Sequence, residues 1–338
     1  MTATTPSFTR RRSSAAESRR RNVLGPRLRW MRHVGCDVCG SDDPELFAER
    51  PPRWDVLHRR FVRCLACGLV YADPRAEPHE ARAHYERVDS RGSGSLDAST
   101  SSDTWRKAVA ARREHLDRAA AIVGDSGRQA RFLELGFGDA SALAAALELG
   151  WEPWGLEYAG WLVEAARERL GLDHVAVGDV ADLAAEQPGA FDVVYAWHVV
   201  EHVLDVDAWL VEIRRLLRPG GALMLGTENM HGLYGRLWTM PARLVRRTPW
   251  PPTSTDHTYW FGHEHLERLL RRHGLAPASV RVYENPPAAL FNATTIKAMR
   301  NPRWALAFGL YLCTAVASVP APRLGGKLEA LALAVENP

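Results

Sequence analysis

Short apolar runs alternate with amphipathic segments over the central part of the chain. The runs predict strands at 131–135, 154–158, 174–179, 191–197 and 222–228. Between them, apolar residues recur at helical spacing in 141–150, 160–171 and 205–221, and each of these segments ends in glycine. Strands that alternate with helices predict an α/β fold with a doubly wound parallel sheet, whose ligand sites lie at the carboxyl ends of the strands.

The first predicted strand runs into a glycine loop, LELGFGDA. Gly136 and Gly138 let backbone N–H groups approach a ligand, but Ser141 stands where the dinucleotide fingerprint has its third glycine. Glu134, inside the strand end, would repel a pyrophosphate and suits a ligand with an ammonium group instead. These two features argue against a nucleotide-dependent oxidoreductase, although that function stays an alternative.

Acidic residues follow the next two predicted strands. Glu157 ends the second strand, where an acid typically accepts hydrogen bonds from ribose hydroxyls. Asp179 follows the third strand and is placed for an adenine amino group, with Val180 against the ring. A glycine loop and two acids at successive strand ends indicate a nucleoside-containing cofactor rather than surface charge.

These motifs, over residues 131–227, resemble those of class I S-adenosylmethionine-dependent methyltransferases. The matching strings are FLELGFGDA, GLEYA, VGDVADL and the long FDVVYAWHVVEHVLDVDAWLVEIRRLLRPGGALML. The resemblance implies S-adenosyl-L-methionine as cofactor and a Rossmann-like, seven-stranded, mostly parallel sheet with an antiparallel edge formed by 278–284 and 327–337. It assigns the methionine moiety to Gly136 and Gly138, the ribose to Glu157, adenine to Asp179 and Val180, and the sulfonium to Trp197 and His198.

The string HVVEH, residues 198–202, also fits the H-x-x-E-H signature of zinc proteases, in which two histidines bind the metal and the glutamate activates water. That chemistry requires both histidines on one continuous helix, whereas this string begins at the end of a buried strand. In the resembling family, EH at this place begins the helix after the fourth strand. We therefore expect Glu201 and His202 to fix the loop, with His202 either in reach of the acceptor or purely structural.

Four of the five cysteines form two C-x-x-C pairs, Cys36/Cys39 and Cys64/Cys67, and each pair is followed by glycine. Two such knuckles predict one structural Zn²⁺ held by four thiolates, in a ribbon too small to have much core of its own. Two redox or free-thiol pairs are the alternative. The string CxxCG…CGLVYADPR also resembles the zinc-binding module of methyltransferases from polysaccharide and natural-product pathways.

Charge and composition indicate where the domain boundaries of the chain lie. With 46% apolar and 25% charged residues, the 338-residue chain is typical of a globular protein. Residues 1–33 hold nine arginines against one acid, which predicts a disordered basic tail, with contact to anionic lipid or nucleic acid as the alternative. The expected divisions are this tail, a zinc-ribbon module at 34–75, a connecting segment with a polar linker at 76–103, and a methyltransferase domain at 104–338.

Two insertions are expected in that last domain. Residues 229–260, rich in proline and aromatic residues, predict a lid over the site. Residues 285–326 predict an apolar helical insertion. Its run 304–319 is shorter than a membrane span, which leaves a core helix or a membrane-surface helix. We expect a cytoplasmic protein, with peripheral contact to anionic membrane as the further alternative and no specific nucleic acid partner.

The leading hypothesis is methyl transfer from S-adenosylmethionine to a sugar, a lipid-linked glycan or a small natural product, with oxygen favoured as the acceptor atom. A histidine could take the acceptor proton. His257 is the first candidate because DHTYWF lies where the lid returns to the core, and His202 and His231 are the others. The alternative hypothesis, from a different functional class, is a module that binds the cofactor but has no catalytic activity.

Overall fold

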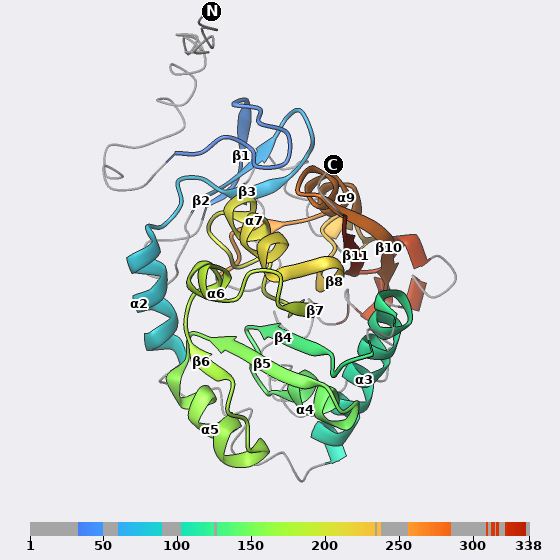
Figure 1. Ribbon diagram of the computed structural model, residues 1–338. Helices are drawn as coiled ribbons and strands as arrows, with labels where there is room; N and C mark the ends of the chain where they lie inside the picture. Colours follow the sequence, from blue (N-terminus) through green and yellow to red (C-terminus); the bar gives the residue numbers. More distant parts are fainter. Residues whose placement is uncertain are drawn as a thin grey trace, which may run out of the picture.

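The computed structural model shows two sheets, a large one that forms the core and a small one at one end of the molecule (Figure 1). Its described residues are 33–49, 60–89, 103–124, 127–233, 235–237, 256–284, 309, 312–314, 316–317 and 322–335.

The large sheet has seven strands in the order β10-β11-β8-β7-β4-β5-β6. The strands are β4 (Arg131–Leu135), β5 (Glu152–Glu157), β6 (Val175–Val177), β7 (Phe191–Trp197), β8 (Leu217–Glu228), β10 (Leu275–Tyr283) and β11 (Lys327–Ala334). The pairs from β8 to β6 are parallel, and β11 is antiparallel to both of its neighbours. The predicted α/β, Rossmann-like, doubly wound and mostly parallel sheet of seven strands is confirmed.

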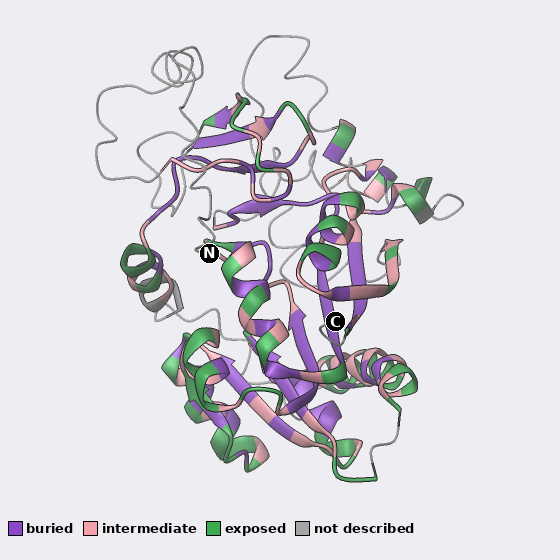
Figure 2. Cartoon of the chain, turned by 45° about the horizontal axis from the view of Figure 1, so that its top comes forward, coloured by how far each residue is buried: buried purple, intermediate pink, exposed green. Residues whose placement is uncertain are grey.

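Helices cover both faces of this sheet. One apolar cluster joins it to α3 (Asp103–Val123), α4 (Ser141–Glu148) and α5 (Gly160–Leu170), and the other joins it to α6 (Val180–Glu186), α7 (Val206–Leu216) and α9 (His263–Arg272). Side chains alternate between the two clusters, as Phe132 and Leu133 of β4 do, because successive strand residues point to opposite faces. The central strands are therefore buried on both sides, whereas the edge strands β6 and β10 are partly exposed and the outer faces of the helices meet solvent (Figure 2).

The order of the strands creates a switch point between β4 and β7. From β4 the chain proceeds to β5 and β6 on one side, and then returns to β7 and β8 on the other. In such sheets the loops after the two central strands diverge and leave a crevice for a ligand. The glycine loop follows β4 and the HVVEH turn follows β7, so both lie at this crevice.

The small sheet contains a strand from the far end of the chain. It comprises β1 (Pro44–Glu49), β2 (Arg60–Cys64), β3 (Val70–Ala72) and β9 (Tyr259–Trp260), all paired antiparallel. The runs RRFVRC and GLVYAD on either side of the second knuckle indicate short strands and form β2 and β3, whereas β1 and β9 were not anticipated. Because β9 pairs with β3, the four-cysteine module shares a sheet with the remainder of the chain.

Buried contacts also join the four-cysteine module to the rest of the chain. Tyr71 and Leu69 belong to the same apolar cluster as Phe261 and Leu266. Arg75, which is 5% exposed, forms an ion pair with Asp37 and donates to the backbone carbonyl of Leu204 at 2.7 Å. The polar linker does not keep the module apart from the large sheet, because sheet pairing, apolar burial and the hydrogen bond from Arg75 to Leu204 all join the two.

The helix expected at 205–221 is shorter than predicted, because α7 ends at Leu216 and the chain enters β8 at Leu217. Helix α7 begins at Val206, where Asp205 caps it by accepting a hydrogen bond from the backbone N–H of Ala208 at 2.9 Å. Glu201 and His202 therefore lie in the turn before the helix and do not begin it. The segment 198–202 is not helical at all, which rules out the helical geometry of a zinc protease. Helix α2 (Pro78–Asp89) and helix α6 were also missed.

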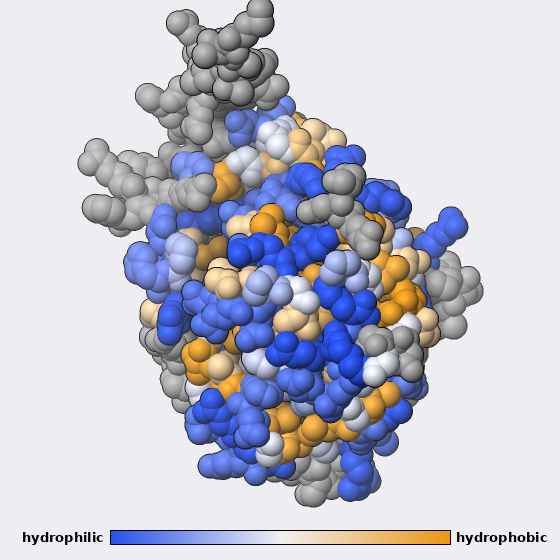
Figure 3. Space-filling view, viewed as in Figure 1, coloured by the Kyte–Doolittle hydropathy of each residue, from blue (hydrophilic) through white to orange (hydrophobic). Residues whose placement is uncertain are grey.

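Several predicted segments lie wholly or mainly outside the described residues. They are the basic tail, the centre of the lid, and most of the apolar insertion with its run 304–319. In the part of the chain that is described, no helix has the length and apolar character needed to cross a membrane. On the face shown in Figure 3, hydrophobic residues form small patches among hydrophilic ones.

Candidate active site and metal centre

The loop after β4 turns in a way that requires glycine. Gly136 and Gly138 have φ values of +64° and +47°, which disfavour residues with a Cβ. A Cβ on Gly136 would also lie 2.7 Å from Cγ2 of Val199, in the turn after β7. The two loops therefore touch at the switch point, and glycine is what permits the contact. Ala140, at φ +55°, adopts the same left-handed region before helix α4.

Glu134 lies beneath this loop, on the face covered by α3 and α4. Its Oε2 accepts a hydrogen bond from the backbone N–H of Leu143 at 3.1 Å. Burial raises the pKa of Glu134 well above its usual range, and the nearby charge of Arg112 opposes this shift. The guanidinium of Arg112 lies 5.0 Å from the centre of the Trp197 ring. Helix α3 thus contributes a cation to the methionine end of the predicted cofactor site, which the sequence did not reveal.

The two acids after β5 and β6 occupy the expected strand ends. Glu157 accepts hydrogen bonds from the backbone N–H groups of Gly138 at 3.1 Å and of Tyr158 at 2.8 Å. Asp179 caps helix α6 by accepting from the N–H of Ala181 at 2.9 Å, and it accepts from the Tyr158 hydroxyl at 3.1 Å. The two carboxylates are joined through Tyr158 on one side of the glycine loop.

Trp197 ends β7 and His198 follows it, with the two rings almost perpendicular. The Trp197 indole covers Gly226, where a Cβ would lie 2.6 Å from the ring, and it packs against His115 of α3 at a centroid distance of 4.2 Å. His198 has φ +58°, a conformation that costs about 1–2 kcal/mol in a residue other than glycine. Such strain persists where the surroundings fix it and often marks a functional site. Its Nδ1 lies 2.9 Å from Oε1 of Glu201.

A cluster of one carboxylate and two imidazoles lies beside His198. Donor atoms of Glu201, His202 and His257 all lie within 4.8 Å of one another. The rings of His202 and His257 meet edge to face, with centroids 4.7 Å apart. The backbone N–H groups of Thr258 and Tyr259 donate to the Glu201 carbonyl at 2.7 and 3.1 Å. The structure therefore brings the two predicted bases together and fixes the segment before β9 against the turn after β7.

The members of this cluster differ in burial and in ionisation. Glu201 is 1% exposed, and its Oε2 is buried without a hydrogen-bond partner. Burial favours a high pKa for Glu201, but the hydrogen bond from His198 and the nearby imidazoles outweigh it and lower the pKa to about 2. Burial, and then the charge of His202, lowers the pKa of His257 to about 4, so this imidazole is neutral at pH 7.

The third histidine candidate lies elsewhere. His231 packs against His265 of α9, with ring centroids 5.1 Å apart. Burial lowers its pKa to about 4 as well. His231 is not part of the cluster that holds His202 and His257. The geometry therefore favours His202 and His257 as the candidate bases near the methyl acceptor.

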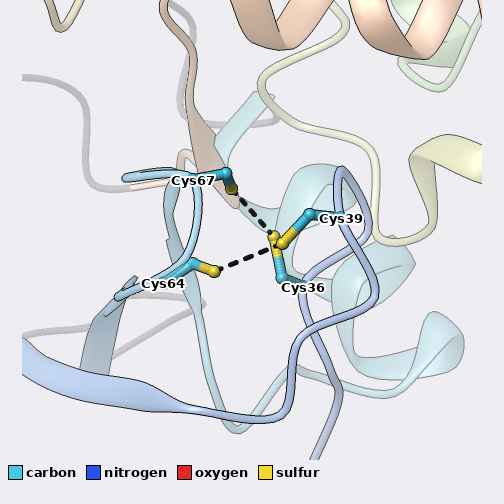
Figure 4. A group of neighbouring side chains, drawn as sticks. All are labelled: Cys36, Cys39, Cys64 and Cys67. Atoms are coloured by element: carbon cyan, nitrogen blue, oxygen red, sulfur yellow. Dashed lines mark hydrogen bonds between the residues drawn. The ribbon is translucent and has the colours of Figure 1, made fainter.

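The four cysteines of the two knuckles converge on one point (Figure 4). Sγ of Cys36 lies 3.5 Å from Sγ of Cys67, and the same distance separates Cys39 from Cys64. Sulfurs about 2.3 Å from a tetrahedral zinc lie about 3.8 Å apart, so the set needs almost no adjustment to hold one. Cysteines in disulfides would be bonded in pairs, and none is. The side chains fit the predicted metal.

Comparison with known proteins agrees with this geometry. Residues 104–280, just over half of the chain, match the family described as a methyltransferase domain. The chain belongs to this methyltransferase family. The predicted class of enzyme is thereby confirmed, and the match covers every strand from β4 to β9 and most of β10.

Curated relatives carry more specific names. The ubiquinone biosynthesis O-methyltransferase of Xanthomonas campestris pv. campestris strain B100 is 40% identical over 147 residues, which are 42% of this chain and 59% of that protein. The protein of the same name from Xanthomonas euvesicatoria is 38% identical over 133 residues, 38% of this chain and 54% of that one. The chain thus spans a little over half the length of these relatives.

Solved structures resemble the chain at lower identity. One is the 1,6-didemethyltoxoflavin-N1-methyltransferase of Burkholderia thailandensis, at 19% identity and a TM-score of 0.44, covering 81% of this chain and 99% of that one. Another is a SAM-dependent methyltransferase from Archaeoglobus fulgidus, at 14% identity and a TM-score of 0.46, covering 68% and 96%.

Proposed function

We propose that this methyltransferase transfers the methyl group of S-adenosylmethionine to an oxygen of a small acceptor. The observation that carries the proposal is the placement of the glycine loop, Glu157 and Asp179 in order at the ends of the neighbouring strands β4, β5 and β6. Glu157 suits the ribose hydroxyls, and Asp179 with Val180 suits adenine. Glu134 suits the ammonium group, because this cation would favour the charged form of a carboxylate whose pKa burial otherwise raises.

Methyl transfer of this kind is an in-line nucleophilic displacement at the methyl carbon. The acceptor oxygen attacks the methyl carbon, a C–O bond forms, the C–S bond breaks, and the sulfur keeps the electron pair as S-adenosylhomocysteine leaves. Alignment and removal of water supply much of the rate. The acceptor proton must also leave, and we propose His257 or His202 as the group that accepts it, since both lie near Glu201, which bonds His198 at the expected position of the sulfonium.

Oxygen methylation is supported by the relatives, whose names record an O-methyltransferase. For this chain we propose a hydroxyl-bearing sugar, lipid-linked glycan or small natural product. The test is transfer of labelled methyl from S-adenosylmethionine to fractionated cell extract, followed by identification of the product. A labelled methyl ether supports the proposal. Cofactor binding without any transfer would instead make the chain a binding module, and a bound nicotinamide cofactor would favour an oxidoreductase.

We further propose that Cys36, Cys39, Cys64 and Cys67 hold one structural Zn²⁺. Thiolates in a closed tetrahedral set leave no position for a substrate, so the ion stabilises the small sheet and takes no part in methyl transfer. The distances between the sulfurs support this assignment.

Arg112 provides a test of the methionine end of the site. We propose that its guanidinium binds the cofactor carboxylate. Arg112→Met should weaken S-adenosylmethionine binding about three- to tenfold, the loss of about one partly exposed charged hydrogen bond. Calorimetric titration measures this. Arg113→Met removes a neighbouring arginine that pairs with Asp117 and should bind the cofactor normally. Equal affinity of both variants would place the carboxylate elsewhere.

Contact with a membrane stays a proposal from sequence alone. The basic lid segment ARLVRR (242–247) and the apolar run 304–319, with Arg300 and Arg303 on its N-terminal flank, together fit a surface of anionic lipid. Co-sedimentation with anionic vesicles should weaken in high salt without vanishing, because salt screens the charges but not the apolar contact. Deleting residues 1–33 should reduce binding only in part. If the full chain stays in the supernatant at low salt, the run is not a membrane-surface helix.

A further inference from the structure

The cluster after β7 has features that a general base does not need. A base requires one imidazole in reach of the acceptor, whereas two imidazoles and a carboxylate converge here, all within 4.8 Å. One oxygen of the carboxylate accepts from His198, while Oε2 is buried and has no partner. A buried charged oxygen without a partner costs free energy, and an ion or ordered water is the usual explanation.

We propose that Glu201, His202 and His257 bind a second divalent cation of the first transition row, which activates the acceptor hydroxyl for methylation. This inference rests on the proposed function. Two imidazoles and one carboxylate form the protein ligand set of catalytic zinc sites that keep an open position, and nitrogen ligands favour such metals over Mg²⁺ or Ca²⁺. The open position is where the acceptor oxygen would bind.

The geometry needs little change to hold the ion. Ligand atoms about 2.0–2.2 Å from a tetrahedral metal lie about 3.3–3.6 Å from one another. The ligand atoms of this cluster all lie within 4.8 Å of one another, so binding an ion would shorten their separations by about 1.5 Å at most. Backbone hydrogen bonds already hold the segments that carry these side chains against each other. The Thr258 hydroxyl donates to the His202 carbonyl at 3.3 Å, in addition to the hydrogen bonds that tie residues 258 and 259 to Glu201.

Outer groups orient the ligands as they do in known metal sites. A metal-binding histidine commonly places its second ring nitrogen against another polar group, and Nδ1 of His202 lies 3.3 Å from the hydroxyl of Tyr85. His198 orients the Glu201 carboxylate in the same way, from the end of β7 where the sulfonium is expected. His198 is therefore a positioning residue, and its left-handed backbone serves to present the ring to Glu201.

The proposed step balances without another reactant. The acceptor O–H loses its proton to water while its oxygen is held by the cation, which lowers the hydroxyl pKa. That oxygen then forms the C–O bond as the C–S bond breaks, and S-adenosylhomocysteine leaves with the electron pair. In this scheme His202 and His257 act as metal ligands, which replaces the direct base role given to them under the proposed function, and they do not themselves accept the proton.

Cobalt can test the site, because the two metal centres differ in spectrum. Protein whose cysteine site is already filled with zinc is titrated with Co²⁺. We expect one further equivalent of Co²⁺ with weak visible bands and without the sulfur-to-cobalt charge-transfer band that thiolates give. Glu201→Gln and His257→Asn should each lower this affinity at least tenfold, while His263→Asn, an exposed histidine of α9 outside the cluster, should not.

Methyl transfer is measured in the same samples. The acceptor is supplied by the cell-extract fraction that accepts labelled methyl in the assay of the proposed function. Removal of the second cation should lower kcat at least tenfold and leave calorimetric S-adenosylmethionine binding unchanged, and adding Co²⁺ or Zn²⁺ back should restore it. Wild-type protein that binds no second equivalent, or transfers methyl equally well without it, overturns the inference and leaves the proposed function standing. Absence of transfer under every metal condition would instead count against the proposed function. Because the wild-type titration decides the matter, a variant that fails to fold does not weaken the test.

Discussion

Cys64→Ser should abolish zinc binding by the four-cysteine module and lower methyl transfer at least about a hundredfold, while S-adenosylmethionine affinity changes less than about threefold. A structural zinc contributes about 10–16 kcal/mol of apparent binding free energy, so the small sheet should not persist without it. Its loss frees β9, which pairs with β3 and directly follows His257. A misplacement of about 1 Å in a reacting group can cost a hundredfold in rate.

A substitution is preferable to chelation here, because a chelator would also remove a cation from the second site. Cys313→Ser is the matched control, since this exposed cysteine lies outside the cluster and should keep its zinc content and activity. Zinc is counted by elemental analysis of freshly reduced protein. If Cys64→Ser keeps full activity, the shared sheet does not position the acceptor side. If wild-type protein holds no zinc, the module is not a zinc ribbon.

Glu157→Ala should lower S-adenosylmethionine affinity about tenfold to a hundredfold. Hydrogen bonds to a charged group contribute about 1.5–3 kcal/mol, which corresponds to that range in the dissociation constant. The carboxylate also accepts from the N–H of Gly138, so its removal loosens the glycine loop in addition to removing the ribose contacts. Isothermal titration calorimetry measures the change directly.

Glu152→Ala supplies the comparison for that measurement. Glu152 lies at the opposite end of the same strand, where it accepts from the Trp154 indole at 2.7 Å and pairs with Arg131. Its loss should leave cofactor affinity within about twofold of the wild type. Unchanged binding in a folded Glu157→Ala protein would remove the ribose assignment and, with it, the main support for the order of the cofactor site.

The large sheet could be predicted because each of its elements is encoded locally. An apolar run such as 191–197 is buried on both faces in a parallel sheet, and glycine marks the turn after β4. The positions of Glu157 and Asp179 follow from those elements. Cofactor-binding residues at strand ends can therefore be predicted from the sequence without knowledge of the packing.

The acceptor side could be predicted only in part, because its geometry depends on contacts between distant segments. His202 and His257 were chosen one at a time, and nothing in the sequence shows that they meet. The same holds for Arg112, which stands on a helix with many arginines, and for the pairing of two-residue β9 with β3. Local patterns carry no signal for such pairings, since each is decided by where the intervening chain returns.

The sharing of the small sheet also constrains the order in which the protein can be made. Strand β9 emerges from the ribosome nearly 190 residues after β3, so the cysteines can capture zinc long before their sheet is complete. Until then β3 is an edge strand whose backbone N–H and C=O groups invite pairing with another chain. Fragments that end before residue 256 should therefore aggregate even when zinc is present, and useful truncations of this protein must retain Tyr259 and Trp260.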